Sequence, residues 1–249
     1  MNRITQGKDA IGILGGMGSL ATAAFFLSLV RAFPGEKEWD RPRIVVDNAC
    51  QMPSRVRAIL YGEKREELIG QLAGHMAGLV NLGCTDIVLC CNTSHAFLPQ
   101  VLPLAQELCG GKPFRLRHIL EILGASLKAK GVEEVSLIAT EGTLDVGIYP
   151  AVLAHHGVKV HGVGPEVYPE LRELIEAVKQ DAIDHAMIDR FEALLLSQAC
   201  RDVVLGCTEF PLLRDALGAK REAGLGVRLH DPLQATARVL VSDYLAEIG

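Results

Sequence analysis

The stretch "DIVLCCNTSH" at residues 86 to 95 decides the fold, because a near copy of its first half, "DVVLGCTEF", returns at residues 202 to 210. In both copies an Asp precedes three aliphatic residues, a small residue, a Cys and then polar residues. An aliphatic run that stops at polar turn residues is typical of a buried strand ending in a loop. Each copy therefore predicts a strand that presents a cysteine at its end, Cys91 in the first and Cys207 in the second.

The surroundings of the two stretches repeat as well. The segment "GILGGMGSL" aligns with "SLIATEGTL", so that Gly18 stands opposite Gly142 and the apolar positions stay in step. The spacing from this loop to the cysteine is similar, because Gly18 to Cys91 spans 73 residues and Gly142 to Cys207 spans 65 by subtraction. We interpret this pattern as an internal duplication of two α/β halves.

Strand-like and helical segments alternate through both halves. "AIGILGGMGSLATAAFFLSLVRAF" has the pattern of a strand, a glycine-rich turn and a helix, and "VYPELRELIEAVKQDAIDHAMIDRFEALLLSQA" is helical throughout. This alternation predicts parallel sheets with helices on both faces. Ligands of such sheets bind beyond the carboxyl ends of the strands, so each half should present its loop and its cysteine on one rim, and two facing rims would form one cleft. The predicted boundaries are 1–115 for the N-terminal lobe, 116–225 for the C-terminal lobe and 226–249 for a C-terminal segment.

Composition narrows the class of protein. The 249 residues are 49% apolar, which is enough for a proper core, and the net charge of −5 with scattered Lys and Arg gives no basic stripe for nucleic acid. No apolar run approaches the length of a membrane span, and "MNRITQGKDA" lacks the order of an export signal. We therefore expect a cytoplasmic protein that binds a small molecule, with no nucleic-acid or membrane partner.

The cysteines are predicted to be free thiols. Seven of them, an odd number, occur in a chain without an export signal, which argues against a disulfide framework. No CxxC pair is present, and the neighbours Cys90 and Cys91 would point to opposite faces of a strand. The sequence therefore predicts no metal site.

The position of the two repeated cysteines indicates acid–base chemistry. A cysteine between a strand and a helix lies near backbone N–H groups and the positive end of a helix, which favours the thiolate. Hydroxyl and amide groups follow the two cysteines, and these groups can bind a substrate carboxylate: Asn92, Thr93, Ser94 and Thr208. A hydrolytic enzyme needs one thiol, whereas inversion of a stereocentre needs an acid and a base on opposite faces. Two equivalent cysteines fit inversion better.

The motifs "GGMGSLAT" (15–22), "CNTSH" (91–95), "IATEGTL" (138–144) and "GCTEF" (206–210) resemble those of the aspartate/glutamate racemase superfamily, and its aspartate racemase branch in particular. The resemblance covers nearly the whole chain. It implies two pseudosymmetric α/β lobes with the active site in the cleft between them, and a racemase that needs no cofactor and no pyridoxal phosphate. It also implies a homodimer and a C-terminal segment that packs back on the first lobe.

The resemblance also assigns roles to residues. Cys91 and Cys207 become the paired catalytic acid and base, Arg55 takes the place of an arginine that holds a substrate carboxylate, and Lys179 matches a lysine that reaches the site. The substrate-binding residues expected in this way are Gly16, Met17, Gly18, Arg55, Asn92, Thr93, Ser94, Thr140, Thr143, Lys179, Thr208 and Glu209.

Departures from the family pattern leave the substrate open. Ser19 and Leu20 replace a Pro-Glu pair, Ser54 replaces an Asp, and Ser94 replaces an Ala. As substrates, aspartate, glutamate and a broader set of amino acids are all consistent with these departures. Another cysteine enzyme of this scaffold, such as a decarboxylase, hydantoin racemase or maleate isomerase, is an alternative, and so is a non-catalytic amino-acid-binding protein.

A dinucleotide site is a weaker interpretation of the first loop. Gly16, Gly18 and Ala21 mimic the glycine fingerprint, and Asp47 follows near the distance expected for a ribose-binding acid. That interpretation leaves the second cysteine unexplained. We prefer a loop whose glycines let backbone N–H groups approach a substrate carboxylate. Pyridoxal phosphate is disfavoured because no lysine follows a glycine-rich loop.

Overall fold

The computed structural model describes residues 10–35 and 37–248. Residues 1–9, which carry most of the segment interpreted as lacking an export signal, lie outside the described part, as do residues 36 and 249. Within the described part, no helix combines the length and the apolar character needed to cross a membrane.

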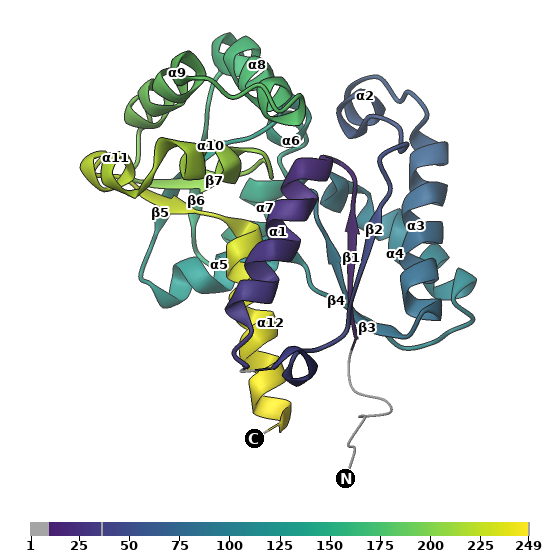
Figure 1. Ribbon diagram of the computed structural model, residues 1–249. Coiled ribbons are helices and arrows are strands. Elements are labelled where there is room, and N and C mark those ends of the chain that lie inside the picture. The colour runs from purple at the N-terminus through teal and green to yellow at the C-terminus, as the bar shows by residue number, and fades with distance from the viewer. Residues whose placement is uncertain (1–9, 36, 249) are drawn as a thin grey trace.

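Two four-stranded sheets of the same design form the framework (Figure 1). Their strand orders are β2-β1-β3-β4 and β6-β5-β7-β8, and every pairing is parallel. The first four strands thus correspond one for one to the last four, which confirms the predicted α/β class. The strands are β1 (Ala10–Gly15), β2 (Ile44–Asn48), β3 (Cys84–Leu89), β4 (Arg115–Leu116), β5 (Glu134–Ile138), β6 (Lys159–Gly162), β7 (Asp202–Leu205) and β8 (Arg228–His230).

Helices cover both faces of each sheet. Those of the first half are α1 (Ser19–Ala32), α2 (Arg55–Leu60), α3 (Arg65–Asn81) and α4 (Leu98–Leu108). Those that follow are α5 (Ile119–Ala129), α6 (Glu141–Val146), α7 (Ile148–Ala154), α8 (Tyr168–Lys179), α9 (His185–Leu196), α10 (Phe210–Leu217), α11 (Ala219–Gly224) and α12 (Pro232–Ile248). In Figure 1 α2 and α3 flank the first sheet on its outer side, and α8 to α11 lie around the second.

Apolar side chains on the inner faces of the two sheets share one core. Ile13 and Val88 of the first sheet belong to the same buried cluster as Leu137 and Val204 of the second. Side chains of α1, α5, α7 and α12 complete this cluster, so these helices lie between the sheets. Two further clusters fill the outer faces, one beneath α3 and α4 and one beneath α8, α9 and α10. The alternation of strand side chains between faces produces this layering.

The aspartates that begin the two repeated stretches, Asp86 and Asp202, form buried ion pairs. Asp86 of β3 is buried and accepts hydrogen bonds from Arg115 Nε and Nη2, both at 2.9 Å, while Asp202 of β7 accepts one from Arg228 Nε at 2.7 Å. Each arginine lies on the short edge strand of its sheet. A buried carboxylate needs such charged donors, so each ion pair fastens the edge strand to a central strand.

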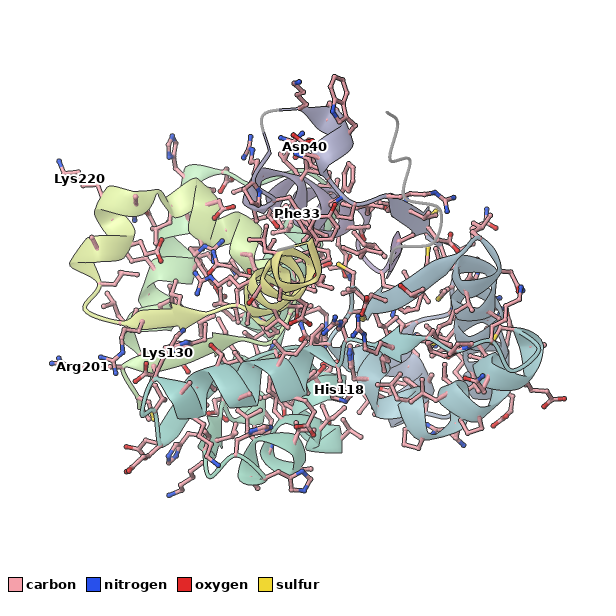
Figure 2. The ribbon with its side chains drawn as sticks, turned by 90° about the horizontal axis from the view of Figure 1, so that it is seen from below. Phe33, Asp40, His118, Lys130, Arg201 and Lys220 are labelled. Carbon is pink, nitrogen blue, oxygen red and sulfur yellow. The ribbon has the colours of Figure 1, made fainter. Side chains whose placement is uncertain are left out.

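The last helix, α12, returns to the first half. Figure 2 shows it nearly end-on between the two halves. Its Tyr244 ring contacts the Phe33 ring edge-on, with centroids 5.3 Å apart, and its hydroxyl donates to the Asp40 carbonyl at 3.1 Å. The returning segment begins later than residue 226, because β8 is the fourth strand of the second sheet. Likewise β4 carries the first sheet to Leu116, one residue beyond the expected boundary.

The long segment predicted to be helical throughout is two helices, α8 and α9. Asp181 between them adopts a φ of 54°, in the left-handed region that ends a helix, and the side chain of Asp184 then caps α9 by accepting from the Met187 N–H at 2.8 Å. Short polar residues with local hydrogen-bonding capacity thus override the apolar periodicity.

We expect the substitution Asp86→Asn to lower the free energy of unfolding by about 3 kcal/mol, because it leaves the mostly buried Arg117 without its buried anionic partner. Asp243→Asn is the matched control. It contacts the same Arg117 but is 41% exposed, so a loss of less than about 1 kcal/mol is expected. Urea unfolding followed by circular dichroism measures both, and equal losses would contradict this ranking.

Candidate active site

Cys91 lies two residues beyond the end of β3 and is 6% exposed. Its neighbour Cys90 packs into the cluster between the sheets, whereas Cys91 belongs to the outer cluster of the first half. The two thiols therefore lie on opposite faces of the chain, as the sequence predicts. The carbonyl of Cys91 accepts a hydrogen bond from His95 Nδ1 at 2.9 Å, which fixes the turn that follows the cysteine.

Cys207 lies two residues beyond β7 and is 7% exposed. Its thiol donates to Glu209 Oε2 at 2.9 Å, and the Thr208 hydroxyl donates to the same oxygen at 3.1 Å. Burial raises the pKa of the Cys207 thiol well above its ordinary value, and the charge and hydrogen bond of Glu209 add to this effect. The backbone N–H of Glu209 at the helix start does lower the pKa of Cys207, as expected, but burial and the Glu209 carboxylate outweigh it, so the net direction is opposite to the expectation of a thiolate.

Lys179 supplies a positive charge near Glu209 and Cys207. It ends α8, and its Nζ donates to Glu176 Oε1 at 2.7 Å. Burial lowers its pKa, but the hydrogen bond to Glu176 and the charge of Glu209 outweigh burial, so the pKa of Lys179 is raised and the ammonium stays charged. That positive charge in turn lowers the pKa of Cys207, against the larger effects of burial and Glu209.

The first loop meets the second half at Gly18. A Cβ atom there would come within 2.3 Å of Glu209 Oε1 and within 3.9 Å of Lys179 Cγ. A larger residue at position 18 would therefore require the Glu209 carboxylate to move. Gly16 has a different constraint: its φ is +82°, a Cβ would collide with the Ala49 backbone at 2.5 Å, and its N–H already donates to Thr22 Oγ1 at 3.0 Å. Its N–H is thus engaged within the loop rather than directed at a substrate.

Three threonines join the halves by hydrogen bonds. The Thr93 hydroxyl lies 2.8 Å from that of Thr143 and 3.2 Å from that of Thr140, and the last two are 2.9 Å apart. Thr140 also caps α6 by accepting from the Thr143 N–H at 3.3 Å. The structure therefore brings these predicted site residues together and pairs their hydroxyls with one another.

Tyr149 is a site residue that the sequence analysis missed. Its hydroxyl donates to Asn92 Oδ1 at 2.8 Å, which links α7 to the turn that carries Cys91. Burial raises the pKa of this phenol well above its ordinary value, and Asp231 adds to the effect. Negative charge on Cys207 or Cys91 raises it further, so the phenol stays protonated beside the two cysteines. An aromatic residue inside an amphipathic helix carries no sequence signal for such a role.

Met17 and Arg55, two further predicted site residues, are joined by a hydrogen bond. Arg55 begins α2, and its Nη1 and Nη2 donate to the carbonyls of Pro53 at 2.9 Å and Met17 at 3.1 Å. The Met17 sulfur accepts from the Ser94 hydroxyl at 3.2 Å. Ser54, which departs from the family pattern, caps α2 by accepting from the Arg57 N–H at 3.3 Å.

Four buried polar atoms around these residues have no hydrogen-bond partner in the described structure: Asn92 Nδ2, Arg55 Nε, His95 Nε2 and Glu209 Oε1. Unpaired buried groups cost free energy and are rare, so each of these atoms is a candidate contact for a polar ligand.

His95 is neutral in this environment. Burial and then the charge of neighbouring His118, whose ring lies 4.8 Å away, lower its pKa from 6.5 to about 3. Because Nδ1 donates to a carbonyl, Nε2 carries the lone pair. His95 can therefore accept a hydrogen bond but supplies no positive charge near neutral pH.

Comparison with known proteins identifies the class. The sequence profile of the Asp/Glu/hydantoin racemase family matches residues 14–240, so the chain belongs to this family and the resemblance of its motifs is confirmed. A glutamate racemase of Carboxydothermus hydrogenoformans is 33% identical over 160 residues, which span 63% of this chain and 57% of that one.

Solved structures show the same fold. The aspartate racemase of Picrophilus torridus superposes with a TM-score of 0.78 at 21% identity, over 95% of this chain and 94% of that one. A variant of arylmalonate decarboxylase in its liganded form superposes with a TM-score of 0.52 at 17% identity, over 94% and 93% of the two chains. One framework of two α/β halves thus carries different chemistries.

We expect Glu209→Gln to lower the pKa of Cys207, because the negative charge that disfavours the thiolate is removed. The rate of alkylation of Cys207 by iodoacetamide, followed by mass spectrometry of its peptide, should reach its midpoint at a lower pH. Glu63→Gln, in the exposed turn between α2 and α3, should leave the midpoint unchanged. An unchanged or higher midpoint in Glu209→Gln would contradict the role of this carboxylate.

Proposed function

We propose that the protein is an amino-acid racemase that needs no cofactor, and that it inverts the α-carbon with Cys91 and Cys207. The observation that carries this proposal is the set of unpartnered buried atoms beside two thiols that come from opposite halves. Family membership supports the reaction class.

The unpartnered atoms complement the charges of an amino acid. Asn92 Nδ2 and Arg55 Nε are donors that suit a carboxylate, while Glu209 Oε1 is an acceptor that suits an ammonium group. We propose that the substrate binds between them, with its α-carbon between the two sulfurs. Both thiols are almost inaccessible, so the two halves must separate for the substrate to enter. When they close again, water is excluded from the reaction.

Proton transfer then follows from the two thiols. The Cys91 thiolate removes the α-proton, and the Cys207 thiol, kept protonated by burial and Glu209, delivers its proton to the opposite face. Product release leaves Cys207 as the thiolate and Cys91 as the thiol, which is the state required for the opposite enantiomer. Exchange with solvent protons restores the first state. Binding of the substrate ammonium at Glu209 offsets the carboxylate charge that disfavours the Cys207 thiolate.

The proposed substrates are aspartate, glutamate or a wider set of amino acids that includes them. Relatives named glutamate racemase and aspartate racemase support this class. Ser19 accepts from Asn48 Nδ2 at 3.0 Å and Ser54 caps a helix, so neither departure from the family pattern adds a charge to the site. A homodimer and a cytoplasmic location stay predictions.

The test is exchange of the α-proton in D₂O, with reduced protein, no added cofactor and single L-amino acids. Loss of the Hα signal by NMR with matching growth of the D-enantiomer by chiral chromatography is expected. Cys91→Ser and Cys207→Ser should each lower kcat/KM for racemisation by about 10² or more, whereas Cys50→Ser, an exposed thiol, should leave it unchanged. Racemisation at the parent rate in both site variants would sink the proposal.

A decarboxylase is the second candidate, favoured by the protonated state of Cys207, since protonation of a carbanion needs only one thiol donor. The same experiments separate the two. Carbon dioxide release from a malonate-type substrate that requires Cys207 alone would favour a decarboxylase. Protection of the protein against unfolding by amino acids without any α-proton exchange would indicate a binding protein.

A further inference from the structure

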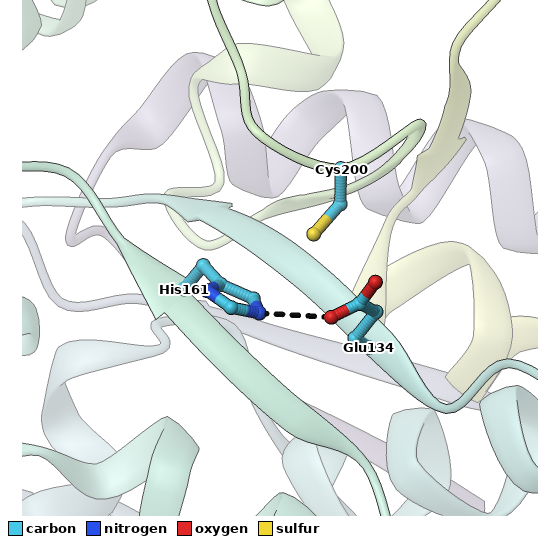
Figure 3. Close-up of side chains that lie close together, drawn as sticks. All are labelled: Glu134, His161 and Cys200. Carbon is cyan, nitrogen blue, oxygen red and sulfur yellow. Dashed lines mark hydrogen bonds and ion pairs between the residues drawn. The ribbon is translucent and has the colours of Figure 1, made fainter.

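A group of three potential metal ligands lies outside the candidate active site (Figure 3). Glu134 is the first residue of β5, His161 is the third residue of β6, and Cys200 lies in the loop that precedes β7. His161 Nε2 lies 3.0 Å from Glu134 Oε2, and these atoms together with the Cys200 sulfur all lie within 4.8 Å of one another.

Strand register fixes two of the three side chains. Ser136 of β5 is the register partner of His161 in β6, so His161 shares the face of Ser136 and of Glu134, which is two residues away on the same strand. The backbone of Cys200 is held by a part-buried hydrogen bond, because its N–H donates to Oγ of the buried Ser136 at 2.9 Å. The framework of the second sheet, not a flexible surface, therefore brings the three groups together.

This cluster is separate from the cysteine pair. Glu134 and Cys200 lie at the amino ends of β5 and β7, whereas Cys207 follows the carboxyl end of β7. The side chains of Glu134 and His161 are 61% and 32% exposed, so an ion in solution can reach them without any movement of the halves.

The chemical types of these three ligands indicate which metal ion the group would bind. A thiolate, an imidazole and a carboxylate suit zinc and similar transition metals, whereas calcium and magnesium prefer oxygen ligands alone. At zinc–ligand distances of about 2.0–2.3 Å, two ligands of a tetrahedral ion are roughly 3.5 Å apart. The glutamate–histidine pair, at 3.0 Å, is close to this separation, and all three ligand atoms lie within 4.8 Å of one another, so binding requires only a modest contraction of the group. A water molecule would complete four ligands.

We propose that Glu134, His161 and Cys200 bind a divalent transition-metal ion of the zinc type, which ties β5 and β6 to the loop before β7. The cysteine spacing predicts no such site, because the ligands are far apart in the sequence and meet only across the sheet. Zinc should then raise the melting temperature of the full chain, since it binds the folded state alone.

The test is titration of the full chain with Co²⁺ and then Zn²⁺, under anaerobic conditions and without thiol reductants. One equivalent of Co²⁺ should produce a thiolate-to-cobalt charge-transfer band that Zn²⁺ abolishes. Cys200→Ser should lose the band, and His161→Gln should weaken Zn²⁺ binding by about 100-fold or more in calorimetry. Cys50→Ser is the matched control and should keep both the band and the affinity.

Two results would contradict the proposed metal site. One is the absence of any thiolate band in the parent protein, and the other is a band that persists in Cys200→Ser, which would assign the metal to other thiols such as Cys91 and Cys207. The His161 side chain is partly exposed and on an edge strand, so His161→Gln reports on the site even where Cys200→Ser folds poorly. Neither readout depends on racemase activity, and failure of one proposal is therefore distinguishable from failure of the other.

Discussion

The single apolar core shared by the inner faces of the two sheets is the constraint on which the rest of the structure depends. Because all strands are parallel within each sheet, every functional loop of a half leaves at one edge. The shared core, with α1 and α12 inside it, holds those two edges together, and Gly18 therefore meets Glu209 and Thr93 meets Thr143 across the boundary. The proposed active site lies where the two halves, which share one design, face each other.

Glu209, at this boundary, also affects the protonation of Cys207. Glu209 contacts the first half at Gly18 and accepts from the Cys207 thiol, so the approach of the halves and the protonation of that cysteine depend on the same carboxylate. In the proposed racemase, substrate binding exchanges some of these contacts for contacts to the amino acid. The buried atoms left without partners, on Asn92, Arg55 and Glu209, are those with the charge or hydrogen-bonding capacity to make that exchange.

Much of the fold and part of the candidate site were predictable from the sequence. Periodicity, turn residues and the repeat of the cysteine stretch are local or periodic signals. They predict the α/β halves and the location of Cys91 and Cys207 at strand ends. The edge strands β4 and β8 were missed because they are only two and three residues long and are held by ion pairs from distant aspartates. Tyr149 was missed, and the state of Cys207 was mispredicted, because both depend on neighbours that only the folded chain supplies.

The most direct test of the two-thiol account is the position of deuterium after the first turnovers of an L-amino acid in D₂O, read by mass spectrometry of the separated enantiomers. Two thiols on opposite faces predict deuterium in nearly every molecule of D-product while the recovered L-substrate still carries protium. Equal early labelling of both enantiomers would show that one group removes and returns the proton, and would contradict the account.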